Sequence, residues 1–281
     1  MSHTGSNVAS AAFRRTAETT LWHRIESRSA AAKASLESEV AACHYLVCSR
    51  VLSGDFLRYM RTRKAPPLTA TELAETSSVT LGHYDEHAES FWQGTKDHDV
   101  SQNRETLLQH LRGDPPYRIL DFGCGPGRDL KFFKEMGHEA IGLDGAERFV
   151  ELARRHSGCE VWHQDFLGLK LPAEYFDGIF ANASLFHVPS QELPRVLREL
   201  WASLKPVGVL FSSNPRGENQ EGWSEERYGV YYDWERWSEL VAAAGFTEIT
   251  HYYRPAGLPR ERQPWLASVW RKTTRSDGVM E

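Results

Sequence analysis

The sequence predicts an α/β fold with a doubly wound sheet, in which strands and helices alternate along the chain. The first observation is a strand–turn–helix unit: the apolar residues 119–120 precede the glycine-rich stretch 123–127 and a helical pattern that starts at Asp129. The second is that strand and helix patterns keep alternating beyond this unit. The third is a β-rich end, with strand patterns near 246–253 and 266–271. Together they indicate a mostly parallel sheet with helices on both faces.

The turn in this first unit suits close contact with a ligand. Asp121 ends the apolar run, and Gly123, Gly125 and Gly127 follow it. Because glycine has no Cβ, these residues allow a tight turn and a close approach of the backbone to a bound group. A strand, a glycine turn and a helix form the usual grip of an α/β sheet on a nucleotide cofactor.

The later elements follow in regular order. Strand patterns near 139–143, 160–162, 176–182 and 207–213 alternate with helix patterns near 146–156, 191–204 and 233–244. The second strand pattern ends in Asp144, and the third leads into Gln164, Asp165 and Phe166.

The first part of the chain has a different pattern. Residues 20–63 contain no proline and a single glycine, and their apolar positions predict two or more amphipathic helices. We therefore expect a helical N-terminal extension over residues 1–80, which either caps the main domain or forms a homodimer contact. Within it, residues 65–78 are typical of a linker with at most a short helix. The main domain is expected over 81–272, and a tail over 273–281.

Composition excludes several classes of protein. The chain has 281 residues, 41% of them hydrophobic and 25% charged, which is ordinary for a soluble globular protein. Its net charge of −5 argues against an enzyme that holds long stretches of nucleic acid, and no apolar run approaches the roughly 20 residues that span a bilayer. The four cysteines match no zinc pattern and are too few for a disulfide scaffold. We expect free thiols in a cytoplasmic protein that does not bind a membrane.

Two residues in the glycine turn argue against a dinucleotide. The dinucleotide fingerprint needs a third glycine at position 128, where this chain has Arg128. The carboxylate of Asp121 would also repel a pyrophosphate. A cofactor with a cationic amino-acid end suits the turn better.

With these motifs the sequence resembles the class I S-adenosylmethionine-dependent methyltransferases over about residues 84–272. The stretch 121–127 is similar to the first motif of that family, and the family's cofactor-binding residues map here onto Asp121, Gly123, Cys124, Gly125 and Gly127. The glycines of that motif lie against the methionine part of S-adenosylmethionine.

The resemblance extends to the later strand ends. Asp144 matches the acidic residue that takes the ribose hydroxyls, and Asp165, followed by Phe166, matches the one that accepts from the adenine amino group. Asn182, at the end of the fourth strand pattern, would sit under the sulfonium. Residues 204–208 resemble a Leu-Lys-Pro-Gly-Gly turn, with valine replacing one glycine. The resemblance implies a Rossmann-like methyltransferase fold with seven strands, the last one antiparallel, and S-adenosylmethionine as the cofactor.

The chemistry that the resemblance implies is an SN2 displacement at a methyl group, which depends mainly on alignment and exclusion of water. His187, just past the fourth strand pattern, is the candidate general base; alternatively it shapes the pocket or contacts the cofactor. Residues 83–103 would fold over the cofactor as a lid, with Tyr84 or Trp92 across the cleft. Together with His187, we assign Tyr84 to the catalytic site. His98 with its neighbouring aspartates lacks a second cluster of ligands, so we expect no metal.

The segment after the fifth strand pattern, 213–232, is where the family usually binds the acceptor. Arg216 is a candidate for binding a carboxylate or phosphate, and Tyr228 and Tyr232 for an aromatic wall together with Trp223 and Tyr231. Packing of the same residues onto the sheet is the alternative.

These observations favour a methyltransferase acting on a small molecule, because a lid and an aromatic insert suit an enclosed pocket. The alternatives are methylation of a protein or RNA docked on the N-terminal helices, and a scaffold protein that binds the cofactor without turnover.

Overall fold

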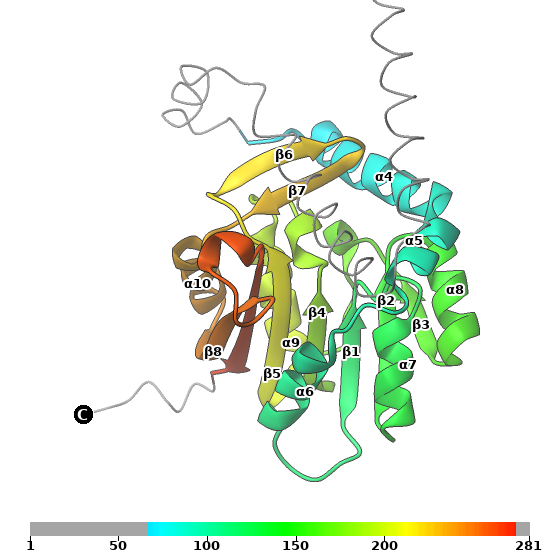
Figure 1. Cartoon of the computed structure of the whole chain (residues 1–281), viewed down its shortest axis with the longest axis vertical. Coiled ribbons are helices and arrows are strands. Elements are labelled where there is room, and N and C mark those ends of the chain that lie inside the picture. The colour runs from blue at the N-terminus through cyan, green and yellow to red at the C-terminus, as the bar shows by residue number, and fades with distance from the viewer. Residues whose placement is uncertain (1–66, 274–281) are drawn as a thin grey trace, which may run out of the picture. The chain divides into compact units, whose positions relative to one another are not determined.

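A computed structural model describes residues 67–273 of the chain (Figure 1). Most of the expected helical extension with its dimer contact, and the end of the chain from residue 274, lie outside the described residues. The described part contains a seven-stranded sheet in the order β3-β2-β1-β4-β5-β9-β8. Neighbouring strands from β3 to β5 are parallel, whereas β9 is antiparallel to both β5 and β8. The predicted doubly wound, mostly parallel sheet is confirmed.

The elements have the following bounds. The sheet consists of β1 (Arg118–Phe122), β2 (Glu139–Asp144), β3 (Glu160–His163), β4 (Phe176–Asn182), β5 (Leu204–Pro215), β8 (Phe246–Arg254) and β9 (Trp265–Lys272). A separate hairpin consists of β6 (Gln220–Ser224) and β7 (Arg227–Tyr231). The helices are α4 (Ala70–Glu86), α5 (Ala88–Thr95), α6 (Ser101–His110), α7 (Arg128–Glu135), α8 (Glu147–Ser157), α9 (Leu193–Ser203) and α10 (Trp234–Ala243). Short 3-10 turns are η1 (Phe166–Gly168), η2 (Leu185–His187) and η3 (Arg260–Arg262).

Successive residues of the central strands point to opposite faces, so the sheet has two hydrophobic cores. Leu120 of β1 belongs to the core that also contains buried leucines of α9 and Trp237 of α10. Its neighbour Ile119 belongs to the other core, which contains Leu107 of α6 and Phe133 of α7. Because these strands are buried on both faces, they have continuous apolar runs rather than alternation, which is the signal on which the sequence prediction rested.

Helix α4 corrects the expected linker at 65–78. It spans 17 residues and begins with a capping box, in which Thr69 and Glu72 each accept a hydrogen bond from the other's backbone N–H. Its buried residues are Thr76 and Thr80, so it lacks the apolar stripe by which an amphipathic helix is found in a sequence. The helix also runs through position 81, at which the main domain was expected to begin.

The hairpin β6–β7 lies beside α4 above the carboxyl ends of the central strands (Figure 1). The backbone N–H of Tyr228 in β7 donates to the hydroxyl of Thr80 in α4 over 3.0 Å. The insert after β5 is therefore part of the covering over this end of the sheet. No helix within residues 67–273 is long and apolar enough to cross a membrane.

Candidate active site

The glycine turn joins the end of β1 to the start of α7 and is held against β2. The backbone N–H groups of Gly123 and Cys124 donate to the carbonyl of Leu143 over 2.8 and 3.0 Å. Gly127 has a φ of +91°, and a Cβ there would lie 2.8 Å from the Cα of Ala153 in α8. Glycine is therefore required at this position by both the backbone angle and the packing of α8.

Asp144, at the end of β2, fixes the turn from the other side. Its carboxylate accepts from the backbone N–H of Gly125 over 2.9 Å and from that of Ala146 over 3.0 Å. Burial raises the pKa of this carboxyl group to about 6, although the backbone hydrogen bonds oppose the shift. Each carboxylate oxygen can accept a second hydrogen bond, so Asp144 can still take a hydroxyl of a bound ligand.

Asp121, at the end of β1, is a buried acidic residue, and one of its oxygens lacks a partner among the described residues. Its side chain is 2% exposed, and its Oδ2 atom has no hydrogen-bond partner among the described residues. Burial, and then the charge of Asp129, raise its pKa well above the usual range. A buried carboxylate oxygen without a partner is costly, and a cationic group bound at the turn would supply one. The residues present therefore fit a cofactor with an ammonium group.

Arg128, which replaces the third glycine, joins the turn to the helices before it. Its guanidinium donates to the carboxylate of Asp129 over 2.7 Å and to the carbonyl of Thr95 in α5 over 2.9 Å. Arg104 of α6 donates to the same carboxylate over 2.6 Å. Two guanidinium groups thus lie near Asp121, a pairing that the sequence analysis did not predict.

Asp165 follows β3 and caps the turn η1, and one of its oxygens accepts from the backbone N–H of Leu167 over 2.8 Å. The other oxygen accepts from the hydroxyl of Ser77 in α4. Phe166 stacks on Phe122 of β1 with ring centroids 4.3 Å apart. The structure therefore brings the ends of β1, β2 and β3 together under α4.

Asn182, at the end of β4, belongs to a chain of polar side chains. Its Oδ1 accepts from the side-chain amide of Asn103 over 2.9 Å, and the Oδ1 of Asn103 accepts from the hydroxyl of Tyr252 over 2.9 Å. Asn103 has no exposed surface. Asn103 and Tyr252 were not among the predicted site residues, although the density of polar residues at 97–103 was a signal for the first.

The lid segment crosses the site with its aromatic residues. Tyr84 of α4 lies 5.3 Å from the ring of Phe149, and Phe91 of α5 lies 5.1 Å from the same ring. Trp92, the other predicted lid residue, stacks on His156 of α8 with centroids 4.3 Å apart. Both predicted lid residues therefore pack on α8, and which of them lies across a bound cofactor stays a prediction.

His187 in η2 forms a hydrogen bond with Tyr84 of the lid segment. Its Nδ1 lies 2.7 Å from the carbonyl oxygen of Tyr228, which can only accept, so Nδ1 carries the proton. Its Nε2 lies 2.8 Å from the hydroxyl of Tyr84 and accepts from it. Burial lowers the pKa of His187 to about 4, so the ring is neutral at neutral pH. The two predicted catalytic residues are in direct contact, and the lone pair of the histidine is engaged by the tyrosine.

The predicted acceptor-binding residues lie in different surroundings. The guanidinium of Arg216 donates to the backbone carbonyls of Gln263 and Arg260 over 2.8 and 2.6 Å, which ties it to the loop before β9. Tyr228 and Tyr232 are buried in the core that contains Trp237, and the hydroxyl of Tyr228 donates to Glu221 over 2.9 Å. Their role in binding an acceptor stays a prediction, and their positions indicate packing as well.

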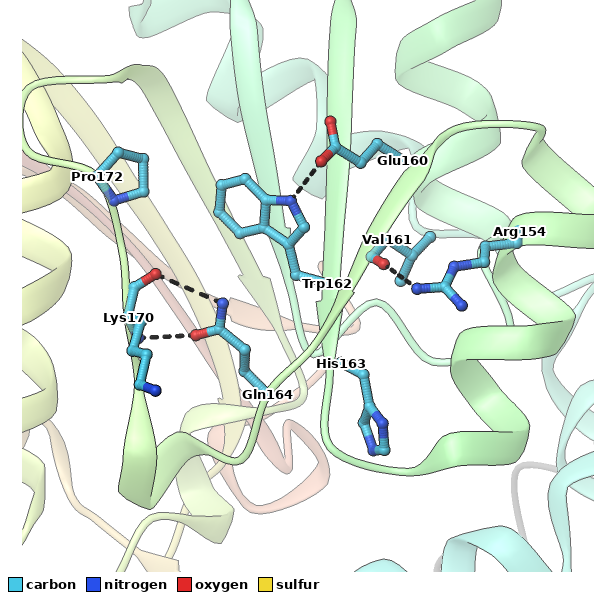
Figure 2. A pocket seen from close by; sticks show the side chains of 8 residues that line it. All are labelled: Arg154, Glu160, Val161, Trp162, His163, Gln164, Lys170 and Pro172. Carbon is cyan, nitrogen blue, oxygen red and sulfur yellow. Dashed lines mark hydrogen bonds between the residues drawn. The ribbon is translucent and has the colours of Figure 1, made fainter.

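A groove with a volume of about 520 Å³ lies along the outer edge of the sheet at β3 (Figure 2). The side chains around it bond within the groove: Trp162 donates to Glu160 over 2.7 Å, and Arg154 donates to the carbonyl of Val161 over 2.6 Å. Gln164 accepts from the backbone N–H of Lys170 over 2.8 Å. These contacts hold the lining of the groove together at the edge of the sheet. In residues 67–273, no group of three or more His, Cys, Asp or Glu side chains has the arrangement of a metal site.

Comparison with known proteins gives one family. Residues 119–208 match a family model described as a methyltransferase domain. The malonyl-acyl-carrier-protein O-methyltransferase of Enterobacter lignolyticus is 27% identical over 146 residues, which are 52% of this chain and 54% of that protein. The trans-aconitate 2-methyltransferase of an Azoarcus species is 32% identical over 116 residues, 41% of this chain and 45% of that protein. The chain thus spans about half the length of the curated relatives it matches.

Solved structures share the fold. The 1,6-didemethyltoxoflavin-N1-methyltransferase of Burkholderia thailandensis, solved with its substrate and S-adenosylhomocysteine, superposes with a TM-score of 0.61. The match covers 75% of this chain and 94% of that one, at 23% sequence identity. At this identity the likeness is evidence for the fold.

Proposed function

We propose that this chain, a class I S-adenosylmethionine-dependent methyltransferase, binds S-adenosylmethionine and transfers its methyl group to a small-molecule acceptor. The observation that carries the proposal is the buried oxygen of Asp121, which has no hydrogen-bond partner among residues 67–273, beside a glycine turn that Asp144 fixes through the backbone N–H of Gly125. When bound, the cofactor supplies a methyl group on a positively charged sulfur, which a nucleophile can displace.

The residues of the strand ends would hold the cofactor along the carboxyl edge of the sheet. Asp121 would neutralise its ammonium group, Asp144 would accept from its ribose, and Asp165 would accept from its adenine. The glycine turn leaves room for the methionine part. Asn182 is held by Asn103 and presents its amide group at the end of β4.

The covering over the site supports a small acceptor. Helix α4 bonds to Asp165 through Ser77 and to His187 through Tyr84, and the hairpin β6–β7 bonds to α4 through Tyr228. Such a closed arrangement excludes water and aligns the reactants, which can remove about 7–11 kcal/mol of barrier. The matched relatives include a methyltransferase named for malonyl-acyl-carrier protein and one named for trans-aconitate, and the second name agrees with a small acceptor. A cytoplasmic location, suggested by the few cysteines, is part of the same proposal.

The proposal predicts the effect of replacing Asp144. In Asp144→Ala, calorimetry should show S-adenosylhomocysteine bound at least about tenfold more weakly than by the wild type, a loss of roughly 1.4 kcal/mol, because the ribose loses its acceptor. Asp114→Ala, which removes a carboxylate from the exposed loop before β1, is the matched control and should bind normally.

Thermal unfolding of both variants controls for a collapsed turn, since Asp144 also bonds to the backbone. Asp144→Asn keeps one acceptor oxygen and should lose less affinity than Asp144→Ala. Unchanged affinity in a folded Asp144→Ala protein would contradict the ribose assignment. A wild-type protein that does not bind S-adenosylhomocysteine would contradict the proposed function.

A further inference from the structure

Strand β7 presents two different faces because its side chains alternate. Tyr228 and Val230 point into the main core. Arg227, Gly229 and Tyr231 therefore lie on the opposite face. Two hydrogen bonds of the Tyr228 backbone fix the strand against its neighbours. Its N–H donates to the hydroxyl of Thr80 in α4, and its carbonyl accepts from the ring of His187 in η2. The second face thus lies against the place where the lid meets η2.

Aromatic rings surround this place. Phe186 lies 3.8 Å from the ring of His187 and 6.0 Å from that of Tyr231. A Cβ added at Gly229 would lie 3.2 Å from the ring of Phe186 and 3.1 Å from the hydroxyl of Tyr231. Glycine therefore keeps space between β7 and η2 that a larger residue would fill.

Arg227 brings a positive charge to the same place. Its Nε atom is buried and has no hydrogen-bond partner among the described residues, and no carboxylate of the described residues forms an ion pair with it. Its neighbour Glu226 bonds instead to His83 over 3.1 Å. Arg227 also hydrogen-bonds the side chain of Tyr84, but this neutral partner leaves its charge unpaired among residues 67–273. A guanidinium in this state beside aromatic rings can bind an anion.

Two effects on neighbouring groups agree with this position of the guanidinium. Burial raises the pKa of Tyr84, and the charge and hydrogen bonding of Arg227 oppose that shift. Burial lowers the pKa of His187, and the charge of Arg227 lowers it further. Arg227 therefore acts on both residues that close the site.

Tyr84 and His187 do not offer a base at neutral pH. The Nε2 lone pair of His187 is engaged by Tyr84, and the phenol of Tyr84 keeps its proton. An acceptor bound between them and Arg227 must therefore arrive with its attacking atom already unprotonated. A carboxylate meets this condition, and its two oxygens match the planar fork of a guanidinium.

We propose that the acceptor is a small organic acid, which binds as its carboxylate against Arg227 and is methylated on a carboxylate oxygen. This inference rests on the proposed methyl transfer. A lone pair of the carboxylate oxygen forms the new bond to the methyl carbon, while the electrons of the carbon–sulfur bond remain on sulfur. The products are a methyl ester and a neutral thioether, and no proton moves.

A binding experiment tests the recognition without turnover. The full-length protein is saturated with S-adenosylhomocysteine, and binding of trans-cinnamate and trans-cinnamamide is compared by saturation-transfer NMR. The acid should bind at least about tenfold more tightly than the amide, since only the acid pairs with the guanidinium. Equal binding of the two would overturn the inference.

Three variants test whether Arg227 is the residue that recognises the acid. Arg227→Gln should abolish the preference for the acid, and Arg227→Lys should keep part of it because it retains the charge. Arg236→Gln removes an equal charge from the surface of α10, where Arg236 pairs with Glu239, and should behave as the wild type. A preference that survives in Arg227→Gln contradicts the assignment.

A transfer experiment tests the reaction. Labelled methyl transfer is measured into a metabolite extract that has been separated on an anion exchanger. Label should appear in the retained acids and be released as methanol by mild alkali. Arg227→Gln should lower kcat/KM for that fraction by at least about 100-fold with S-adenosylhomocysteine affinity within about twofold of the wild type. Transfer into neutral or cationic compounds, or an alkali-stable product, would overturn this inference and leave the proposed methyltransferase standing.

Discussion

The hydrogen bond between Tyr84 and His187 decides what each residue can do. Because the imidazole donates through Nδ1 to the backbone of β7, its Nε2 must accept, and the phenol occupies it. The sequence left open whether His187 is a general base or shapes the pocket, and this geometry favours the second role over abstracting a proton. Its low pKa follows first from burial, and the charges of Arg227 and His83 lower it further.

This pKa predicts a dependence of stability on pH. The folded protein keeps His187 neutral down to about pH 4, whereas the unfolded chain binds the proton near pH 6.5. The stability that His187 contributes is therefore fully present above pH 6.5 and is lost as the pH falls toward 4. Urea unfolding at pH 7.5 and pH 5 should show the advantage of the wild type over His187→Gln shrinking by up to about 2 kcal/mol. The same substitution at the exposed His98 is the control, and an advantage that does not change with pH would contradict the assigned pKa.

At the scale of elements, α4 is held mainly by polar contacts. Ser77 bonds to Asp165, Thr80 to the backbone of β7, and Asp85 accepts from the backbone N–H of Arg148 over 2.8 Å. Leu81 packs over Gly145, where an added Cβ would lie 2.8 Å from the leucine. An element with few buried apolar contacts opens more readily than the core, which suits a lid that must admit a ligand.

The stability of such a helix should depend on its N-cap residue, Thr69. Thr69→Ala removes the side chain that accepts from the backbone of Glu72 and should destabilise α4 by about 1 kcal/mol. Hydrogen exchange should be faster over residues 70–86 while the core strands are unchanged. Ser78→Ala, on an exposed position of the same helix, is the control and should exchange as the wild type. If hydrogen exchange over residues 70–86 is as slow in Thr69→Ala as in the wild type, the tertiary contacts alone set the stability of the lid.

The sequence predicted elements whose stability comes from burial and missed those held by hydrogen bonds. The central strands gave continuous apolar runs, and their order and type were confirmed. Helix α4 buries two threonines and was expected as a linker. In the hairpin, Tyr231 and Tyr232 were assigned to one wall, although neighbours in a strand point to opposite faces. Applying that alternation would have separated Tyr228 and Tyr232 from Arg227, but only the structure shows which face meets the lid.

Over the whole molecule, the cofactor side of the site was easier to predict than the acceptor side. Asp121, Asp144 and Asp165 each end or follow a parallel strand, and parallel strands present their carboxyl ends at one edge of the sheet. Topology alone therefore brings them together. The acceptor side depends on contacts between α4, η2 and β7. Tyr84 of α4 and His187 of η2, for example, lie 103 residues apart in the sequence. No local pattern encodes such a contact.

The described residues also predict which part of the chain the cofactor site needs. The predicted cofactor-binding residues all lie within the described residues 67–273. At the start of this range, the backbone N–H of Leu68 donates to the side chain of Gln191 over 2.6 Å. A chain that begins at Pro67 should bind S-adenosylhomocysteine within about twofold of the full-length protein, as calorimetry can show. A chain that begins at Ala88 lacks α4 and should bind at least about tenfold more weakly, because Asp165 loses Ser77 and the site is open to water.

The same pair of chains tests the homodimer that the sequence analysis proposed for the N-terminal helices. If the dimer contact lies in residues 1–66, light scattering should give a dimer for the full-length protein and a monomer for the chain that begins at Pro67. Cofactor affinity should be equal in both, because the predicted cofactor-binding residues all lie within residues 67–273. Equal masses for the two chains would contradict the proposed contact. A loss of affinity in the shorter chain would instead show that residues 1–66 take part in the cofactor site.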